Sequence, residues 1–378
     1  MKKRTRPHAA RITAAVAPSL PASAANRTEP PPRPAPRANW SDPPGGNWVF
    51  APGNWSNPPG GNWSNPPGGN YSDPPGWSYP PGAERQVGMG YHPDLPDCRD
   101  CVWDDFAKFV TSTEEATNER IKHLADRAKK SLPADYNLGD NPKHPLPPIE
   151  DQGRTNSCTS QAASGLVEYL YRWATGDYND FSRMFIYYNA RKLLGWHGDT
   201  GAYIRTTFKA MRLFGVPPET EWPFDLSALD TQPQPYHYSY ANNFKTMSYA
   251  RLDSYRDDPG KIRSRIKQTV HMGFPVEFGF PVYSCIQKLQ NFVIPVPGSN
   301  DKLLGGHAVL AVGYHENVPY VDNQGQSQRG ALIIRNSWGT GWGDQGYGFL
   351  PYWYIERGYA SDFWTAYDRS WLKLAGFG

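Results

Sequence analysis

The uneven distribution of proline limits which part of this chain can form a packed domain. Of the 38 prolines in 378 residues, 19 lie within residues 1–90. Over residues 39–76 variants of NWSNPPGG recur every seven to eight residues. Each unit combines one aromatic residue with a proline- and glycine-rich turn, and so few apolar atoms do not offset the entropy cost of ordering the backbone. We expect a disordered Pro/Gly-rich tail over residues 1–90, a spacer or a turn-rich ligand arm whose partner is unknown.

The tail also carries the excess positive charge of the chain. Residues 1–90 have a net charge of +5 and the remainder −2. A near-neutral body does not indicate nucleic-acid binding, and no apolar run of 18 residues predicts a membrane span. The basic start and the small residues 22–24 resemble a secretory signal, but Pro18 and Pro21 interrupt the apolar segment. An intracellular location is favoured, with secretion through this weak signal as the alternative.

Residues 91–132 form a polar, turn-rich transition that we interpret as a leader or propeptide-like segment. Cys98 and Cys101 form a C-x-x-C motif, which could be half of a zinc site, a redox pair or a local disulfide. No second C-x-x-C follows, and Pro96 and Asp97 do not suggest the strand-to-helix setting of a redox pair. We therefore expect neither a metal nor another cofactor.

Hydrophobic periodicity predicts a folded domain over residues 133–378. Apolar residues first recur at helical spacing and then give way to short, β-rich runs punctuated by glycine. The predicted helices are 158–173, 184–194, 203–214 and 259–271, and the predicted strands are 274–280, 307–314, 331–335 and 346–350. Helices followed by strands indicate an α+β fold in two halves with a cleft between them.

Residues in this domain suit nucleophilic catalysis by a thiol. Cys158 begins a predicted helix, where the positive end of the helix dipole favours thiolate. His307 opens a strand after two glycines, and the side-chain carbonyl of Asn336 could hold an imidazole in its useful tautomer. Gln152, six residues before Cys158, could donate to an oxyanion. The remaining cysteine of the domain, Cys285, is expected to be buried and inert.

Three runs resemble those of the papain-like cysteine peptidases, family C1, and follow the same order. They are PIEDQGRTNSCTSQAAS, GGHAVLAVGY and IIRNSWGTGWGDQGYG. The resemblance covers residues 133–378 and implies the papain-like two-subdomain fold, with a helical half and a β-barrel-like half. It also implies that Cys158 is the nucleophile, that His307 is the base and then the acid, and that Asn336 orients His307. Gln152 and the Cys158 backbone N–H are implied to form the oxyanion hole.

The resemblance further implies an activity and substrate-binding residues. Gly201 or Ala202 is expected to pair with an extended substrate, because a residue without a side chain permits close approach. Trp338, also assigned to substrate binding, is expected to shield the contact between His307 and Asn336 from water. The implied reaction is hydrolysis of peptide bonds in peptide or protein substrates through an acyl-enzyme. A silent peptide-binding pseudo-peptidase and a transpeptidase using the same acyl-enzyme remain alternatives.

The chain departs from the family pattern around its cysteine. Thr155 and Thr159 stand where the family usually has Cys and Trp or Tyr, and Asn156 replaces a glycine. The usual disulfide near the cleft is therefore expected to be absent, as in the bacterial branch of the family. Residues 91–132 resemble the short leader of that branch, and we expect them to lie across the cleft. Asp199, near the cleft, is interpreted as a solvated loop charge, with a role in specificity as the alternative.

Overall fold

The computed structural model describes most of the chain from Gly88 onward. The described residues are 88–111, 126–128, 130–242, 248–254 and 257–367. The predicted disordered tail up to residue 87, with its aromatic repeats, lies outside them. Residues 88–90, expected to belong to the disordered tail, are described and form hydrogen bonds with the domain. The leader is therefore taken from here on to begin at Gly88.

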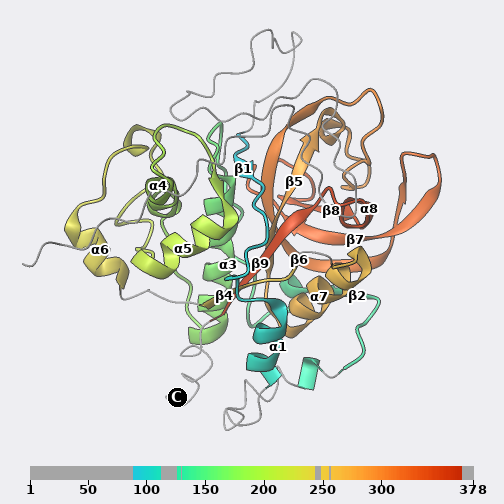
Figure 1. Cartoon of the computed structure of the whole chain (residues 1–378), viewed down its shortest axis with the longest axis horizontal. Helices are drawn as coiled ribbons and strands as arrows, with labels where there is room; N and C mark the ends of the chain where they lie inside the picture. The colour runs from blue at the N-terminus through green and yellow to red at the C-terminus, as the bar shows by residue number, and fades with distance from the viewer. Residues whose placement is uncertain (1–87, 112–125, 129, 243–247, 255–256, 368–378) are drawn as a thin grey trace, which may run out of the picture. The chain divides into compact units, whose positions relative to one another are not determined.

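One half of the described domain is helical (Figure 1). It contains α3 (Cys158–Thr175), α4 (Arg183–Leu194), α5 (Ile204–Phe214) and α6 (Pro235–Ala241). Helix α3 is buried along most of its length and packs against the sheet of the other half, as well as against α4 and α5. It ends at Gly176, whose φ of 86° lies in the left-handed region that favours glycine.

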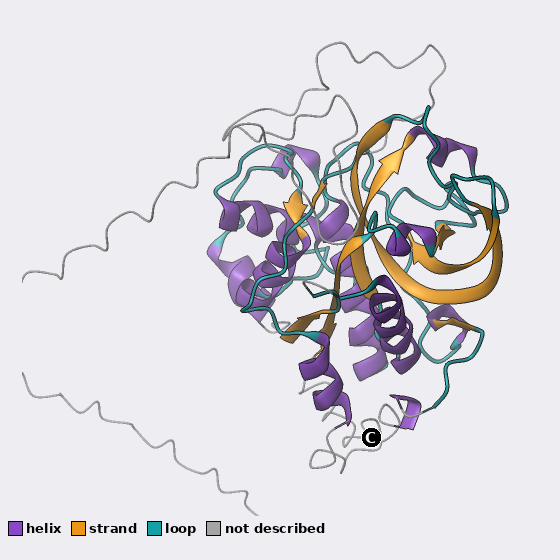
Figure 2. Cartoon of the chain, turned by 45° about the vertical axis from the view of Figure 1, so that its right-hand side comes forward, coloured by secondary structure: helices purple, strands orange, loops and turns teal. Residues whose placement is uncertain are grey.

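The other half is an antiparallel sheet whose strands curl around a core (Figure 2). The strand order is β4-β9-β5-β6-β7-β8, with β2 paired beside β6. The strands are β2 (Asp135–Asn137), β4 (Ser248–Arg251), β5 (Val276–Tyr283), β6 (Leu303–Val321), β7 (Ser327–Arg335), β8 (Tyr347–Pro351) and β9 (Ser361–Tyr367). Helices α7 (Pro259–Met272) and α8 (Trp353–Glu356) also belong to this half, and short 3₁₀ helices of the domain occur at Leu138–Asp140, Leu226–Ala228 and Ser284–Lys288.

The predicted helices and strands are present, with different ends. Strand β6 continues beyond the predicted 307–314 because its first part pairs with β5 and its second part with β7. The second part is polar and half-exposed, so it lacks the apolar signal of a buried strand. Helix α6 and strands β4 and β9 were not predicted. The two strands pair with each other across more than 100 residues, which local periodicity does not reveal.

The leader packs into the domain between its two halves (Figure 1). Strand β1 (Tyr91–His92) pairs in parallel with β3 (Ala202–Tyr203) of the helical half and also contacts β5 and β6. Helix α1 (Trp103–Thr111) contacts β4, and Phe106 is completely buried. The leader thus contributes to the core of the folded domain.

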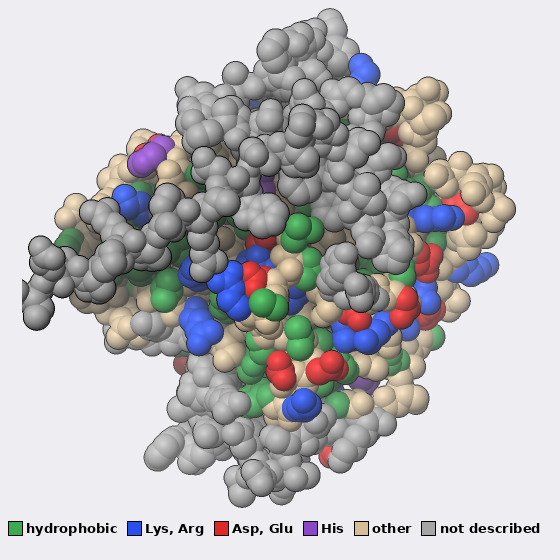
Figure 3. Space-filling view, viewed as in Figure 1, with side chains coloured by type: hydrophobic (Ala, Val, Ile, Leu, Met, Phe, Trp, Pro, Cys, Tyr) green, Lys and Arg blue, Asp and Glu red, His purple; other side chains and the backbone are tan. Residues whose placement is uncertain are grey.

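The described surface carries charges of both signs. On the face in Figure 3, acidic and basic side chains are interspersed among hydrophobic and neutral ones. Within the described ranges, no helix is both long and apolar enough to cross a membrane.

Candidate active site

Cys158 lies where the helical half meets the sheet. It is the first residue of α3 and is completely buried. The backbone N–H groups of Thr159 and Ala308 point at its thiol and lower the thiol pKa. Because Ala308 directly follows His307 on β6, the fold brings the thiol and the predicted base into the same small region.

His307 is oriented by Asn336, which follows β7. Its Nε2 lies 2.7 Å from Oδ1 of Asn336, and the backbone N–H of Ser337 donates to the same oxygen at 2.8 Å. Since this oxygen accepts, Nε2 carries the hydrogen and Nδ1 is the basic nitrogen. Nδ1 is buried and makes no hydrogen bond within the described part of the chain. The imidazole can therefore take up a proton at Nδ1.

Trp338 covers this pair. Its ring stacks on the imidazole of His307 with centroids 4.4 Å apart and an interplanar angle of 23°. Trp342 meets Trp338 edge to face at 5.7 Å. The two rings exclude water from the buried contact between His307 and Asn336, which strengthens that hydrogen bond.

Gln152 holds its amide group toward the leader. Its Nε2 donates to the backbone carbonyls of Gly88 at 2.9 Å and Thr155 at 2.8 Å. Its Oε1 accepts from the hydroxyl of Ser337 at 2.6 Å, which fixes the amide orientation. The group that the sequence predicts as an oxyanion donor therefore already binds the carbonyl of a peptide bond.

The segment 88–90 is hydrogen-bonded to both sides of this site. Its backbone makes the following bonds: Gly88 N–H to Gly153 O at 2.9 Å, Met89 N–H to Asn156 Oδ1 at 3.1 Å, Gly90 N–H to Gly306 O at 2.9 Å, and Ala202 N–H to Gly90 O at 2.9 Å. A Cβ atom on Gly201 would lie 2.1 Å from the Gly90 oxygen, and the φ of Gly201 is 80°. Both residues predicted for substrate pairing thus contact an extended peptide segment, Gly201 by lacking a side chain and Ala202 by donating.

Burial opposes charge on both Cys158 and His307 in this form. It raises the pKa of Cys158 to about 12, although the surrounding N–H groups oppose the shift. It also lowers the pKa of His307 to about 4, against the opposing effect of Asn336. The pKa of Cys158 therefore shifts in the direction opposite to the one expected from the helix N-terminus, because loss of hydration is its largest cause.

The interpretation of Asp199 as a solvated loop charge is also wrong. Its carboxylate accepts the backbone N–H of Asn156 at 2.9 and 3.0 Å and the hydroxyl of Tyr187 at 2.7 Å. The side-chain amide of Asn156 donates back to the Asp199 carbonyl at 2.7 Å. Burial raises the pKa of Asp199. This carboxylate fixes the loop that precedes Cys158, and the replacement of glycine by Asn156 is the sequence signal for it.

Hydrogen bonds take the place of the missing disulfide. The hydroxyl of Thr155 donates to the carbonyl of Gln152 at 2.8 Å and lies 2.7 Å from the Ser157 hydroxyl. The hydroxyl of Thr207 donates to that of Thr159 at 3.2 Å, where the family usually has an aromatic ring. These polar contacts tie the loop and the start of α3 together.

All four cysteines are free thiols. Cys98 is exposed, while Cys101 is half-buried with its sulfur 3.6 Å from the hydroxyl of Tyr367. Cys285 is buried, with its sulfur 3.7 Å from the carbonyl of Pro295. No disulfide therefore joins Cys98 to Cys101 here.

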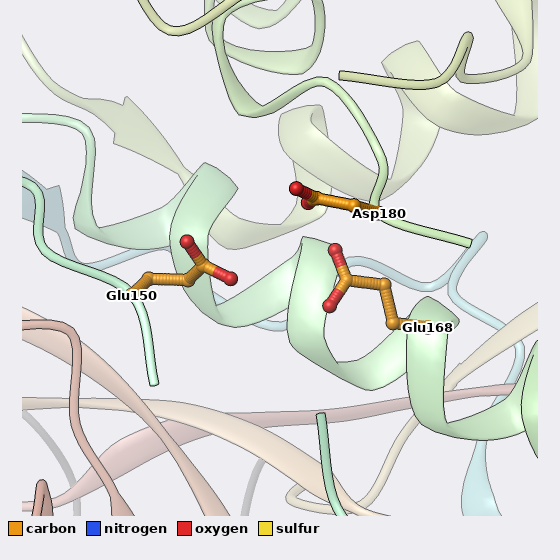
Figure 4. Close-up of side chains that lie close together, drawn as sticks. All are labelled: Glu150, Glu168 and Asp180. Carbon is orange, nitrogen blue, oxygen red and sulfur yellow. The ribbon is translucent and has the colours of Figure 1, made fainter. Parts of the chain in front are cut away.

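Glu150, Glu168 and Asp180 bring three carboxylates together (Figure 4). The guanidinium of Arg183 lies among them, paired with Glu150 and, at 3.2 Å, with Asp180. Glu168 receives hydrogen bonds at one oxygen, and burial raises its pKa to about 7. Arg183 already pairs with two of these carboxylates, so we assign the cluster a structural role.

Sequence reasoning missed the charged residues that hold the leader. Arg205 of α5 forms two hydrogen bonds with the carboxylate of Asp100, at 2.9 and 2.8 Å, and an ion pair with Asp94. Arg251 donates to the Asp94 carbonyl at 3.0 Å, and the Asp94 N–H donates to Asp362 at 3.1 Å. No local motif signals these contacts, since the partners lie more than 100 residues apart.

Comparisons with known proteins agree with this arrangement. The family described as papain family cysteine protease matches residues 132–357. The uncharacterized peptidase C1-like protein L477 of Acanthamoeba polyphaga mimivirus is 33% identical over 288 residues, 73% of this chain and 85% of that protein. Cathepsin K of Gallus gallus is 29% identical over 207 residues, 54% of each chain.

A solved structure gives the same result. The crystal structure of xylellain, a cysteine protease from Xylella fastidiosa, superimposes with a TM-score of 0.56 at 32% identity, over 75% of this chain and 97% of that one. The expected α+β, papain-like fold is confirmed. The chain therefore belongs to the papain family of cysteine proteases and is a cysteine-type peptidase.

Proposed function

We propose that this protein is a cysteine endopeptidase that hydrolyses peptide bonds through an acyl-enzyme on Cys158, and that its leader holds it inactive until it is displaced. One observation carries the proposal: the carbonyl of Gly88 accepts a hydrogen bond from Gln152 beside the start of α3. A peptide carbonyl at this position supports the role of Gln152 as a donor to the oxyanion.

The proposed reaction begins with proton transfer from the Cys158 thiol to Nδ1 of His307. The sulfur then attacks the scissile carbonyl carbon, and Gln152 donates to the oxyanion that forms. His307 returns the proton to the leaving amine as the C–N bond breaks, which leaves a thioester on Cys158. Water then attacks the thioester, His307 takes a proton from it, and the carboxylic acid and the thiol are released. Asn336 keeps the second imidazole nitrogen protonated throughout.

The leader escapes this reaction because of its direction. It runs parallel to β3, and the amide nitrogen after the Gly88 carbonyl, that of Met89, donates to Asn156 on the helical side. The leaving nitrogen is therefore engaged away from His307, and productive substrates run in the opposite direction. Tethering gives the leader a high effective concentration, so it competes well with a free peptide.

Displacement of the leader also activates the thiol in this proposal. Burial is the largest cause of both pKa shifts in the closed form. Once water reaches the cleft, the N–H groups of Thr159 and Ala308 and the helix N-terminus favour the thiolate again. Opening therefore creates the binding site and the nucleophile together.

The test uses the full chain, a fluorogenic peptide reporter and a thiol-directed epoxide. We expect slow cleavage by the full chain, labelling at Cys158 alone, and no cleavage by Cys158→Ala. Gln152→Ala should slow cleavage about 10²–10³-fold without abolishing it. Cys285→Ala is the matched control and should cleave like the unmodified chain. Cleavage by Cys158→Ala at the unmodified rate would refute the proposal, and product masses separate hydrolysis from transpeptidation.

A further inference from the structure

Tyr91 of the leader fills a pocket between the two halves of the domain. Its side chain is only 5% exposed. Two glycines make room for it: a Cβ atom on Gly279 would lie 2.0 Å from the ring, and one on Gly306 would lie 3.2 Å from a ring carbon. Any side chain at position 279 would therefore overlap the outer end of the tyrosine ring.

The floor of this pocket offers a hydrogen bond. The hydroxyl of Tyr91 lies 3.2 Å from that of Ser361 on β9, which pairs directly with Gly279. Burial raises the pKa of Tyr91 well above its ordinary value, so the ring keeps its proton. The strand pairing is irregular here, and Asp362 has a φ of 64°. This bulge gives the strand its bend beside the hydroxyl.

A second polar side chain belongs to the same face of β5. Glu277 is completely buried, and neither of its carboxyl oxygens has a hydrogen-bond partner within the described part of the chain. Because side chains alternate along a strand, Glu277 points to the same side as position 279. Burial, reinforced by Asp362, raises the pKa of Glu277 well above its ordinary value. The region around the pocket floor is thus polar, and the raised pKa of Glu277 disfavours a negative charge beside a neutral hydroxyl.

We propose that this pocket, once the leader is displaced, is the subsite that selects substrates carrying a tyrosine side chain over those carrying phenylalanine, through the hydroxyl of Ser361. The inference rests on the proposed function, since it names the substrate class of the same cleft. Phenylalanine fills the ring-shaped space equally well but leaves the Ser361 hydroxyl without its partner, which has a cost in a buried site.

The geometry also limits which substrate residue enters the pocket. In the leader, Gly88 supplies the carbonyl bound by Gln152, and Tyr91 lies three residues further along. Three extended residues span roughly 10 Å. A substrate running in the opposite direction places the second to fourth residues before its scissile bond within this distance.

The experiment uses the full chain with Tyr91→Ala, which empties the pocket and leaves the rest of the leader in place. Peptide libraries that vary the second, third and fourth residues before the cut are digested, and matched tyrosine and phenylalanine peptides are then compared. One net hydrogen bond corresponds to about a fivefold preference in kcat/KM for tyrosine. Adding Ser361→Ala should bring this ratio close to one, whereas adding Ser239→Ala, on the exposed face of α6, should leave it unchanged.

The outcomes separate this inference from the proposed function. Equal kcat/KM for tyrosine and phenylalanine, or a tyrosine preference that survives Ser361→Ala, overturns the inference while cleavage itself supports the peptidase. Enrichment of lysine or arginine also overturns it, because the pocket then recognises charge through Glu277. Absence of cleavage for every peptide, with Cys158 still labelled by an epoxide, counts against the proposed function instead.

A double-mutant cycle tests the contact between the Tyr91 and Ser361 hydroxyls directly, without comparing different substrates. Tyr91→Phe and Ser361→Ala each remove one hydroxyl of the pair, and the readout is the basal cleavage of one reporter by the full chain. We expect each single variant to raise basal cleavage a few-fold and the double variant to add little more. Fully multiplicative effects would contradict a direct contact between the two hydroxyls.

Discussion

The inner and outer parts of the leader are held in different ways. The inner part, residues 88–91, binds mainly through backbone hydrogen bonds to Gln152, Gly306 and Ala202 and through one tyrosine ring. The outer part, residues 94–100, binds through carboxylates paired with Arg205 and through backbone contacts with Arg251 and Asp362.

The two parts therefore have different roles: the inner part occupies the site, and the outer part raises the affinity of the leader for the domain. Backbone bonds of the inner part are available to any extended peptide, so a substrate can replace them one for one. The charged contacts of the outer part have no counterpart in a generic peptide, so they give the leader its advantage. We infer that the inner part blocks the site and the outer part keeps the blocker in place.

Gly90→Ala tests the inner part and should have the largest effect. A Cβ atom there would lie 2.0 Å from the backbone oxygen of Asn156, and the φ of Gly90 is 153°. The inner segment then no longer fits, and we expect reporter cleavage by the full chain to rise about 100-fold, the size of a conformational shift of about 3 kcal/mol. Gly298→Ala, in an exposed loop, is the control. Unchanged cleavage in Gly90→Ala would show that the inner part does not block the site.

Arg205→Ala tests the outer part and should have a smaller effect, about tenfold. It removes a two-point contact with Asp100 and an ion pair with Asp94, while the inner segment still fits. Arg212→Ala, exposed on the same helix, controls for changes in α5. Asp100→Asn, which changes the leader residue of the same contact, should also raise reporter cleavage. If neither Arg205→Ala nor Asp100→Asn raises cleavage, the charged contacts do not retain the leader.

The smallest effect on cleavage is expected outside both parts, in the carboxylate cluster, where the measured quantity is stability instead. The pKa of Glu168 is raised to about 7 in the folded chain and is about 4.3 in an unfolded one. The folded chain binds this proton more tightly, so the free energy of unfolding falls as pH rises from about 4.3 to about 7, by up to about 4 kcal/mol.

Glu168→Gln removes this titration. It should therefore weaken the pH dependence of the free energy of unfolding without raising reporter cleavage at neutral pH. Urea unfolding of the Cys158→Ala chain, with and without Glu168→Gln, measures the slope. Asp135→Asn, on an exposed strand, is the control. Equal slopes for the three chains would show that Glu168 titrates alike in the folded and unfolded states.

The sequence predicted the catalytic domain better than its regulation. The predicted helix at 158–173 follows from local periodicity, and its observed end at Gly176 follows from backbone conformation. Cys158, His307 and Asn336 lie within short motifs that resemble those of the papain-like cysteine peptidases. Each of these signals lies within a short stretch of sequence.

The remaining features depend on contacts between distant residues. The parallel pairing of Tyr91 with Ala202 and the contact of Arg205 with Asp100 join positions more than 100 residues apart. The neutral state of Cys158 depends on burial, which a helix N-terminus in the sequence does not reveal. Asp199 was misinterpreted for the same reason, because its partners come from two other segments.

The reactivity of the Cys158 thiol tests the central claim most directly. The measurement is the rate of iodoacetamide alkylation at Cys158, followed by mass spectrometry between about pH 5 and pH 9, for the full chain and for Gly90→Ala. The account predicts slow alkylation of the full chain across this range and at least tenfold faster alkylation of Gly90→Ala, because the uncovered thiol ionises. Equal rates for the two chains would contradict the claim that the leader keeps this thiol covered and neutral.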